Sequence, residues 1–91
     1  MKDLSGFQRD ILVVISGNDN PSGVEINQSL SDYYDGEVMG GRLYPNLEKL
    51  VESGLVDKGT KDNRTNEYSL TKWGQRELES RREWEDGMVE I

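Results

Sequence analysis

Apolar side chains recur at helical spacing in three successive stretches of the chain, which predicts three helices. The first covers about residues 5–16, and the second covers about 23–34, where Ser22 can cap the first turn. The third covers about 42–53 and contains a proline only in its first turn, where the missing N–H costs little. Its apolar stripe consists of Leu43, Leu47, Leu50 and Val51.

A glycine marks the end of the third predicted helix. We expect Gly54 in the left-handed conformation, with Leu55 folding back toward Leu50. Short strands follow at about 55–60 and 66–70, and the polar loop between them makes the pair a β-hairpin.

A last helix is predicted over about 72–86, with Thr71 as its cap and residues 87–91 as a short tail. Its apolar spacing is irregular, and we expect Trp73 to anchor it to the core. The segment 37–39 could supply a third strand beside the hairpin.

Three helices, a two-stranded hairpin and a final helix are the element order of a winged helix-turn-helix, an α+β fold of mainly helical content. We expect a single winged-helix domain over 1–91, with a core at 5–70 and a C-terminal dimerisation helix at 71–86. In this architecture the third helix enters the major groove of DNA, and the hairpin is the wing.

Composition limits the function classes. The chain has 91 residues, of which 33% are hydrophobic, so we expect one small core completed by a partner chain. Cysteine and histidine are both absent, which removes thiolate and imidazole catalysis and the usual zinc sites. An enzyme is therefore the least favoured class, and no cofactor is expected. With no apolar run of membrane-spanning length and no signal-peptide pattern, we expect a soluble, cytoplasmic protein.

Charge is unevenly distributed along the chain. The net charge of −7 argues against a nucleic-acid partner, because phosphate binding relies on Lys and Arg. Residues 40–76, however, carry seven basic and five acidic side chains, whereas both flanking parts are acidic. The positive stretch coincides with the third helix and the wing, which favours DNA binding by these two elements.

Side chains suited to DNA gather on the third helix and the wing. Arg42 can donate two hydrogen bonds to guanine, and Asn46 can pair with adenine. Tyr44 and Lys49 suit phosphate oxygens. Each of these could also be an ordinary exposed side chain, and a charged loop can simply protect a sheet edge. The expected contacts in the wing are Lys58, Lys61, Asn63, Arg64 and Thr65.

The last helix also indicates a homodimer. Trp84 lies among many charges and has no evident partner in its own chain, and an exposed tryptophan favours an interface. The alternative is that this ring lies flat on its own domain. The residues expected at the dimer contact are Leu4, Phe7, Leu78, Trp84 and Met88.

Residues 41–47 (GRLYPNL), followed by the Gly-Leu-Val of 54–56 and by Tyr68, resemble the PadR-type transcriptional regulators over about 5–85. The resemblance implies a dimeric winged-helix repressor whose first and last helices make the dimer contact and whose third helix and wing bind a palindromic operator. The single C-terminal helix is similar to the short branch of that family. Some relatives sense small aromatic molecules, but the sequence identifies no effector here.

The abundance of carboxylates is similar to that of proteins from salt-loving archaea or their viruses. Because counterion release weakens as salt rises, we hypothesise that cations bridge carboxylates and phosphates at high salt. The main alternative function is a winged-helix protein-interaction module that uses the acidic first and last helices and binds no DNA.

Overall fold

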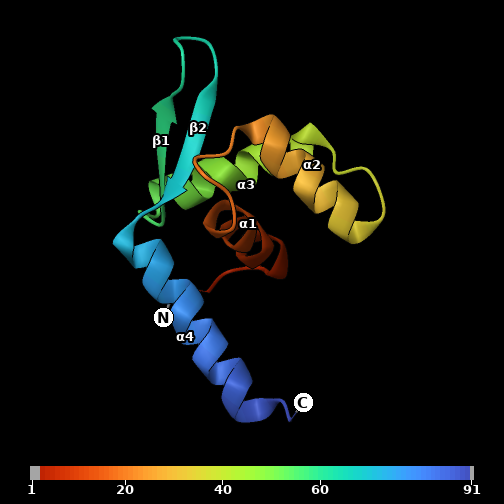
Figure 1. The fold of residues 1–91 in the computed structure, drawn as a ribbon, viewed down its shortest axis with the longest axis vertical. Helices are drawn as coiled ribbons and strands as arrows, with labels where there is room; N and C mark the ends of the chain where they lie inside the picture. The colour runs from red at the N-terminus through yellow and green to blue at the C-terminus, as the bar shows by residue number, and fades with distance from the viewer. Residues whose placement is uncertain (1–2, 91) are drawn as a thin grey trace.

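The computed structural model describes residues 3–90, and its elements follow the predicted order (Figure 1). The four predicted helices and the hairpin are confirmed. Their bounds are α1 Gly6–Ser16, α2 Gly23–Tyr34, α3 Gly40–Glu52, β1 Val56–Thr60, β2 Asn66–Leu70 and α4 Lys72–Met88.

Side-chain caps start three of the helices. The hydroxyl oxygen of Ser5 accepts a hydrogen bond from the backbone N–H of Gln8, and the Gln8 side chain accepts one from the Ser5 backbone N–H, so α1 begins with a capping box. Ser22 and Glu25 form the same arrangement at α2. Thr71 caps α4 by accepting a hydrogen bond from a backbone N–H of the first turn. The predicted caps of α2 and α4 are therefore confirmed.

The third helix starts earlier than predicted but ends as expected. It begins at Gly40, two residues before the predicted start, without a side-chain cap. At its end Gly54 has φ 82°, and its N–H donates to the carbonyl of Val51 at 3.0 Å. The N–H of Leu55 donates to the carbonyl of Leu50 at 3.1 Å. These bonds form a Schellman motif, which turns the chain so that Leu55 enters the core directly before β1.

Helices α1, α2 and α3 enclose the core, and the hairpin covers one end of it (Figure 1). Val56 and Tyr68 attach the two strands to the core through their buried side chains. The fully buried helical side chains are Ile11, Leu12, Ile26, Leu30, Leu43, Leu47 and Leu50.

The prediction of a third strand at 37–39 is wrong. The sheet has two antiparallel strands, and the segment that bridges to β2 precedes α2: Ser22 forms an isolated bridge with Glu67, and Tyr68 N–H donates to the carbonyl of Pro21 at 2.9 Å. The backbone of Val38 instead bonds to the side chains of α2, at 3.0 Å and 2.7 Å. These bonds satisfy the groups that a strand would have offered to the hairpin.

After the hairpin, α4 runs along α1, and its C-terminal half extends beyond the helical body (Figure 1). The expectation that Trp73 anchors α4 is wrong, because the residue is 53% exposed and its ring is covered by the cationic groups of Lys72 and Arg76. The buried residue at this point is Gly74. Within residues 3–90, no helix has the length and apolarity that crossing a membrane requires.

Gly74 allows the close contact that holds α4 against the start of the hairpin. A Cβ at this position would stand 2.2 Å from the carbonyl oxygen of Leu55, which already accepts the N–H of Thr71 at 3.1 Å. We predict that Gly74→Ala lowers the free energy of unfolding by about 2 kcal/mol or more, because the backbone must move to admit the methyl group. Gly87→Ala, in the same helix with open space around it, should cause no loss. Urea unfolding of both variants measures this, and equal stability would contradict the proposed close contact.

Candidate nucleic-acid interface

The outward face of α3 carries small side chains in its first two turns and charged ones after them. At about 3.6 residues per turn, the side opposite the buried leucine stripe carries Gly41, Pro45, Glu48, Lys49 and Glu52. Gly41 and Pro45 are exposed, and a Cβ at Gly41 would meet nothing within 4 Å. The backbone of the first two turns can therefore come close to the surface of a partner. Lys49, in the next turn, adds a positive charge to the same face.

Arg42 lies at the edge of this face that is next to α1. Its guanidinium group is 3.9 Å from the centroid of the Phe7 ring, a cation–π contact. Phe7 is only 8% exposed and also packs against Tyr34, with ring centroids 6.2 Å apart. Little of the Phe7 ring is left for the dimer contact that the sequence predicts.

Asn46 lies on the same edge, and its amide is occupied within the chain. Its Oδ1 accepts a hydrogen bond from Gln8 Nε2 at 3.1 Å, and its Nδ2 donates to the backbone carbonyl of Arg42 at 2.8 Å. Sequence reasoning missed Gln8, because nothing in the local pattern of either helix indicates a contact across 38 positions.

Tyr44 lies on the opposite edge of α3 and contacts the first turn of α2. A Cβ at Gly23 would be 2.7 Å from a Tyr44 ring atom. The absence of a side chain at Gly23 therefore lets Tyr44 lie over α2 while its ring stays partly exposed. Gly23 is a second residue of the site that sequence reasoning did not single out.

The wing is joined to α3 by an ion pair. Lys58 Nζ lies 2.7 Å from Glu48 Oε1, and this hydrogen bond raises the pKa of Lys58. Because the ammonium group is occupied by Glu48, Lys58 acts in this structure as a link between β1 and α3. The pair joins the hairpin to the edge of the outward face of α3.

A tight turn forms the tip of the wing. The carboxylate of Asp62 accepts hydrogen bonds from the N–H groups of Arg64 and Thr65, and Asn63 has φ 68°. This turn leaves the side chains of Lys61 and Arg64 exposed. The pKa of the Glu25 carboxyl is lowered, mainly by its hydrogen bonds with Ser22 and to a lesser extent by Lys61.

Several cations on α3 and at the wing tip have no acidic partner. Within the described part of the chain the ion pairs are Lys58 with Glu48 and Arg81 with Glu85. On α3 and the wing tip, the exposed cations outside these pairs are Arg42, Lys49, Lys61 and Arg64. The exposed cations of α4 outside these pairs are Lys72, Arg76 and Arg82. Four positive charges on α3 and the wing are therefore available to a polyanion.

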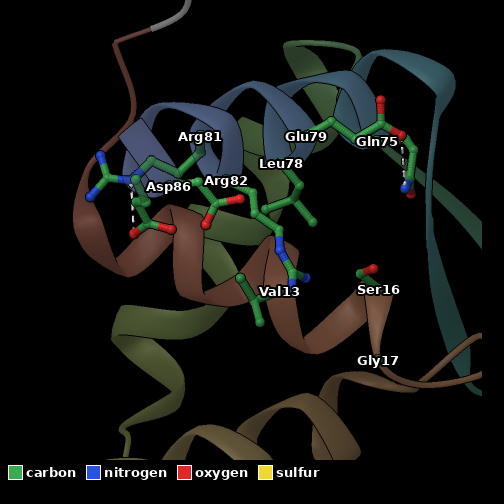
Figure 2. A pocket seen from close by; sticks show the side chains of 10 residues that line it. Val13, Ser16, Gly17, Gln75, Leu78, Glu79, Arg81, Arg82 and Asp86 are labelled. Carbon is green, nitrogen blue, oxygen red and sulfur yellow. Dashed lines mark hydrogen bonds and ion pairs between the residues drawn. The ribbon is translucent and has the colours of Figure 1, made fainter. Parts of the chain in front are cut away.

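A second feature is the groove of about 530 Å³ between α1 and α4, where Figure 2 shows Arg82 reaching from α4 toward α1. Leu78 and Val13 line it. Beyond the groove, Trp84 and Met88 are 52% and 67% exposed. Leu4, the remaining residue of the predicted dimer contact, is partly buried against the chain's own core.

Comparison with known proteins gives one family and several similar structures. The model of the transcriptional regulator PadR-like family matches residues 11–80. The structure of RosR from H. salinarum is 43% identical, with a TM-score of 0.90, and the match covers 99% of this chain and 82% of that one. No curated protein sequence matches the chain.

Two further structures share the fold. A C80S mutant of MarR from E. coli, complexed with operator DNA, is 28% identical, with a TM-score of 0.75 over 86% of this chain and 53% of that one. F93 from STIV, a winged-helix DNA-binding protein, is 20% identical, with a TM-score of 0.80 over 97% of this chain and 96% of that one. The winged-helix fold predicted from the element order is confirmed.

Tyr34, which packs on Phe7 beside Arg42, gives the fold a pH dependence. Burial raises its pKa to about 12, and the hydrogen bond that its hydroxyl donates to Asp10 adds to the rise. Tyrosine in an unfolded chain titrates near about pH 10. The folded state therefore holds this proton more tightly, and the resulting stability is complete below about pH 10 and lost as the pH rises toward about 12.

We predict that Tyr34→Phe removes part of the fall in unfolding free energy between about pH 10 and pH 12. Urea unfolding across this window measures the slope. Tyr33→Phe, at the exposed neighbouring ring, serves as the control and should keep the slope of the unaltered protein. Identical slopes for the two variants would show that the Tyr34 proton is not linked to folding.

Proposed function

Because the chain belongs to the transcriptional regulator PadR-like family, we propose that it regulates transcription by binding operator DNA through α3 and the wing. The observation that carries this proposal is that the wing lies beside the outward face of α3, since the Schellman motif at Gly54 leads directly into β1 and an ion pair between Lys58 and Glu48 joins the two elements. Exposed cations without acidic partners lie on both elements. A helix that enters the major groove beside a wing that contacts the DNA phosphates requires exposed cations on both elements.

The side chains divide into groups that position the protein and groups that recognise bases. Lys49, Lys61 and Arg64 would contact phosphates, and Asn63 with Thr65 would add hydrogen bonds at the wing tip. Tyr44, on the edge of α3, would donate a hydrogen bond from its hydroxyl to a phosphate oxygen. The small outward residues of α3 allow its backbone to approach the base edges.

Arg42 is the residue that we assign to guanine. The flat face of its guanidinium group stacks on the Phe7 ring. Within residues 3–90 its side-chain N–H groups make no hydrogen bond. The edge of the group therefore keeps its donors for the two acceptors that guanine presents in the major groove.

A homodimer would place two such surfaces on one duplex. The half of α4 that extends beyond the body exposes Trp84 and Met88, and the adjoining groove between α1 and α4 offers Val13 and Leu78 among charged side chains. We propose that the partner subunit covers both, as α1 and α4 of each copy meet. Two-fold symmetry then matches a palindromic operator, which bound protein would block as a repressor.

The test of DNA binding is selection of bound duplexes from a random pool in high-KCl buffer. We expect a palindrome with half-sites about one helical turn apart. The wing variant Lys61→Ala/Arg64→Ala should bind the selected duplex about tenfold or more weakly. The slope of log affinity against log salt concentration should become less steep by about 2. Lys72→Ala/Arg76→Ala removes the same charge from α4 and should leave both values near those of the unaltered protein.

A different result would decide against the proposal. If the pool yields no enriched sequence at any KCl concentration, the chain does not act by operator recognition. The protein-interaction module then becomes the better account, with α1 and α4 as its surface. A similar loss in the wing variant and the α4 variant would mean that overall charge, and not the wing, determines binding.

The dimer is tested with two tryptophans of nearly equal exposure. We predict that Trp84→Ala weakens dimerisation by about 2 kcal/mol or more, which is about a 30-fold rise in the dimer dissociation constant. Each ring is stacked with a cation of its own helix. Trp73→Ala should have little effect, because Trp73 lies at the start of α4 next to the hairpin and not on the half that extends beyond the body. Sedimentation equilibrium measures both, and an unchanged dimer in Trp84→Ala would place the interface elsewhere.

A further inference from the structure

Gln8 joins the first turn of α1 to the middle of α3 through a continuous series of hydrogen bonds. The Ser5 backbone N–H donates to Gln8 Oε1 at 3.1 Å, and Gln8 Nε2 donates to Asn46 Oδ1 at 3.1 Å. Asn46 Nδ2 then donates to the carbonyl of Arg42 at 2.8 Å. Three hydrogen bonds thus run from the backbone of one helix start to the backbone of the other helix's first turn.

The direction of this series is set by its two ends. A backbone N–H can only donate and a backbone carbonyl can only accept, so the Ser5 N–H requires Oε1 of Gln8 to face it. The Nε2 group of Gln8 then faces Asn46 as a donor, so Asn46 must accept this hydrogen bond with Oδ1. The Nδ2 group of Asn46 is left to meet the carbonyl of Arg42. Each amide therefore has one orientation that satisfies all its partners.

A second contact between the same two helices adjoins the series. Phe7, the residue before Gln8, supports the guanidinium group of Arg42 at 3.9 Å. Consecutive residues of α1 therefore hold Arg42 in two ways: one supports the end of its side chain, and the other, through Asn46, bonds to its carbonyl. The bond between Gln8 and Asn46 is partly buried, where hydrogen bonds are less exposed to competition from water.

We propose that Gln8 and Asn46 are positioning residues for DNA recognition, which set the orientation of the first turns of α3 and hence of Arg42. This inference rests on the proposed function and changes the role expected of Asn46 from the sequence. Both groups of its amide are occupied within the chain, so a pair of hydrogen bonds to adenine would require two existing bonds to break. Asn46 acts through Arg42 and makes no base contact itself.

Positioning and stability are separable here. The buried leucine stripe already attaches α3 to the core, so loss of a partly buried amide contact changes the unfolding midpoint only slightly. Two hydrogen bonds to one base edge, in contrast, demand strict geometry from the arginine that makes them. A small rotation of α3 therefore reduces discrimination between sequences and leaves sequence-independent phosphate binding unchanged.

The experiment is a double-mutant cycle on discrimination. Gln8→Met, Asn46→Ala and the double variant are each titrated with the duplex selected from the random pool and with a scrambled duplex of the same length. We expect the ratio of the two affinities to fall about fivefold in each single variant and no further in the double variant. Affinity for the scrambled duplex should stay close to that of the unaltered protein in all three variants. The urea midpoint should stay close in Asn46→Ala and fall modestly in Gln8→Met, which also removes the bond that Gln8 accepts from the Ser5 N–H. Gln28→Met, which removes an exposed amide of α2, should change none of these values.

Three results would overturn the inference. A lower ratio in Asn46→Ala with an unchanged ratio in Gln8→Met would show that Asn46 contacts the DNA itself. Unchanged ratios in both variants would show that the hydrogen bonds do not orient Arg42. If the unaltered protein binds both duplexes equally, the proposed function fails along with the inference, and that failure is distinguishable because it appears before any substitution is made.

Discussion

The packing of α3 against α1 is the contact on which the rest of the site depends. A helix that contacts DNA must bury one side firmly and leave the other side open, and α3 buries a narrow leucine stripe while the first two turns of its other side carry Gly41 and Pro45. The Schellman motif at Gly54 ends the helix within one turn, so the chain enters β1 directly beside it. The position of the wing therefore follows from the position of α3.

The charge of the proposed DNA surface depends on which carboxylates are paired within the protein as well as on the net charge of the chain. The chain carries a net charge of −7, yet Glu48 is paired with Lys58, and Glu25 is bound to the cap of α2. These two carboxylates near the proposed DNA surface are thus occupied within the protein, while Lys49, Lys61 and Arg64 remain outside any ion pair. A strongly acidic protein can in this way keep a locally positive surface, since screened charges act mainly over short distances.

Helix α1 connects the two halves of the proposed mechanism. On one side it meets α3 through Phe7 and Gln8, and on the other Val13 lines the groove against α4. If a partner subunit covers the groove, the helix that it contacts is the one that supports Arg42. In the proposed function, dimerisation and the presentation of α3 to DNA would therefore share one structural element.

Local features of the sequence determined most of the fold. Caps such as Ser22 and Thr71, the stop at Gly54 and the helical spacing of apolar residues act over a few positions, so they are visible without the structure.

Contacts between distant segments were decided only by the tertiary structure. The strand-like segment 37–39 bonds to α2, Trp73 lies outside beneath neighbouring cations, and Phe7 is covered within its own chain. In the site, the sequence indicated which side chains suit DNA, but not that Asn46 is bonded to Gln8 or that Gly23 makes room for Tyr44. Such partners depend on how separate helices pack, and no periodicity within one helix records what the next helix places against it.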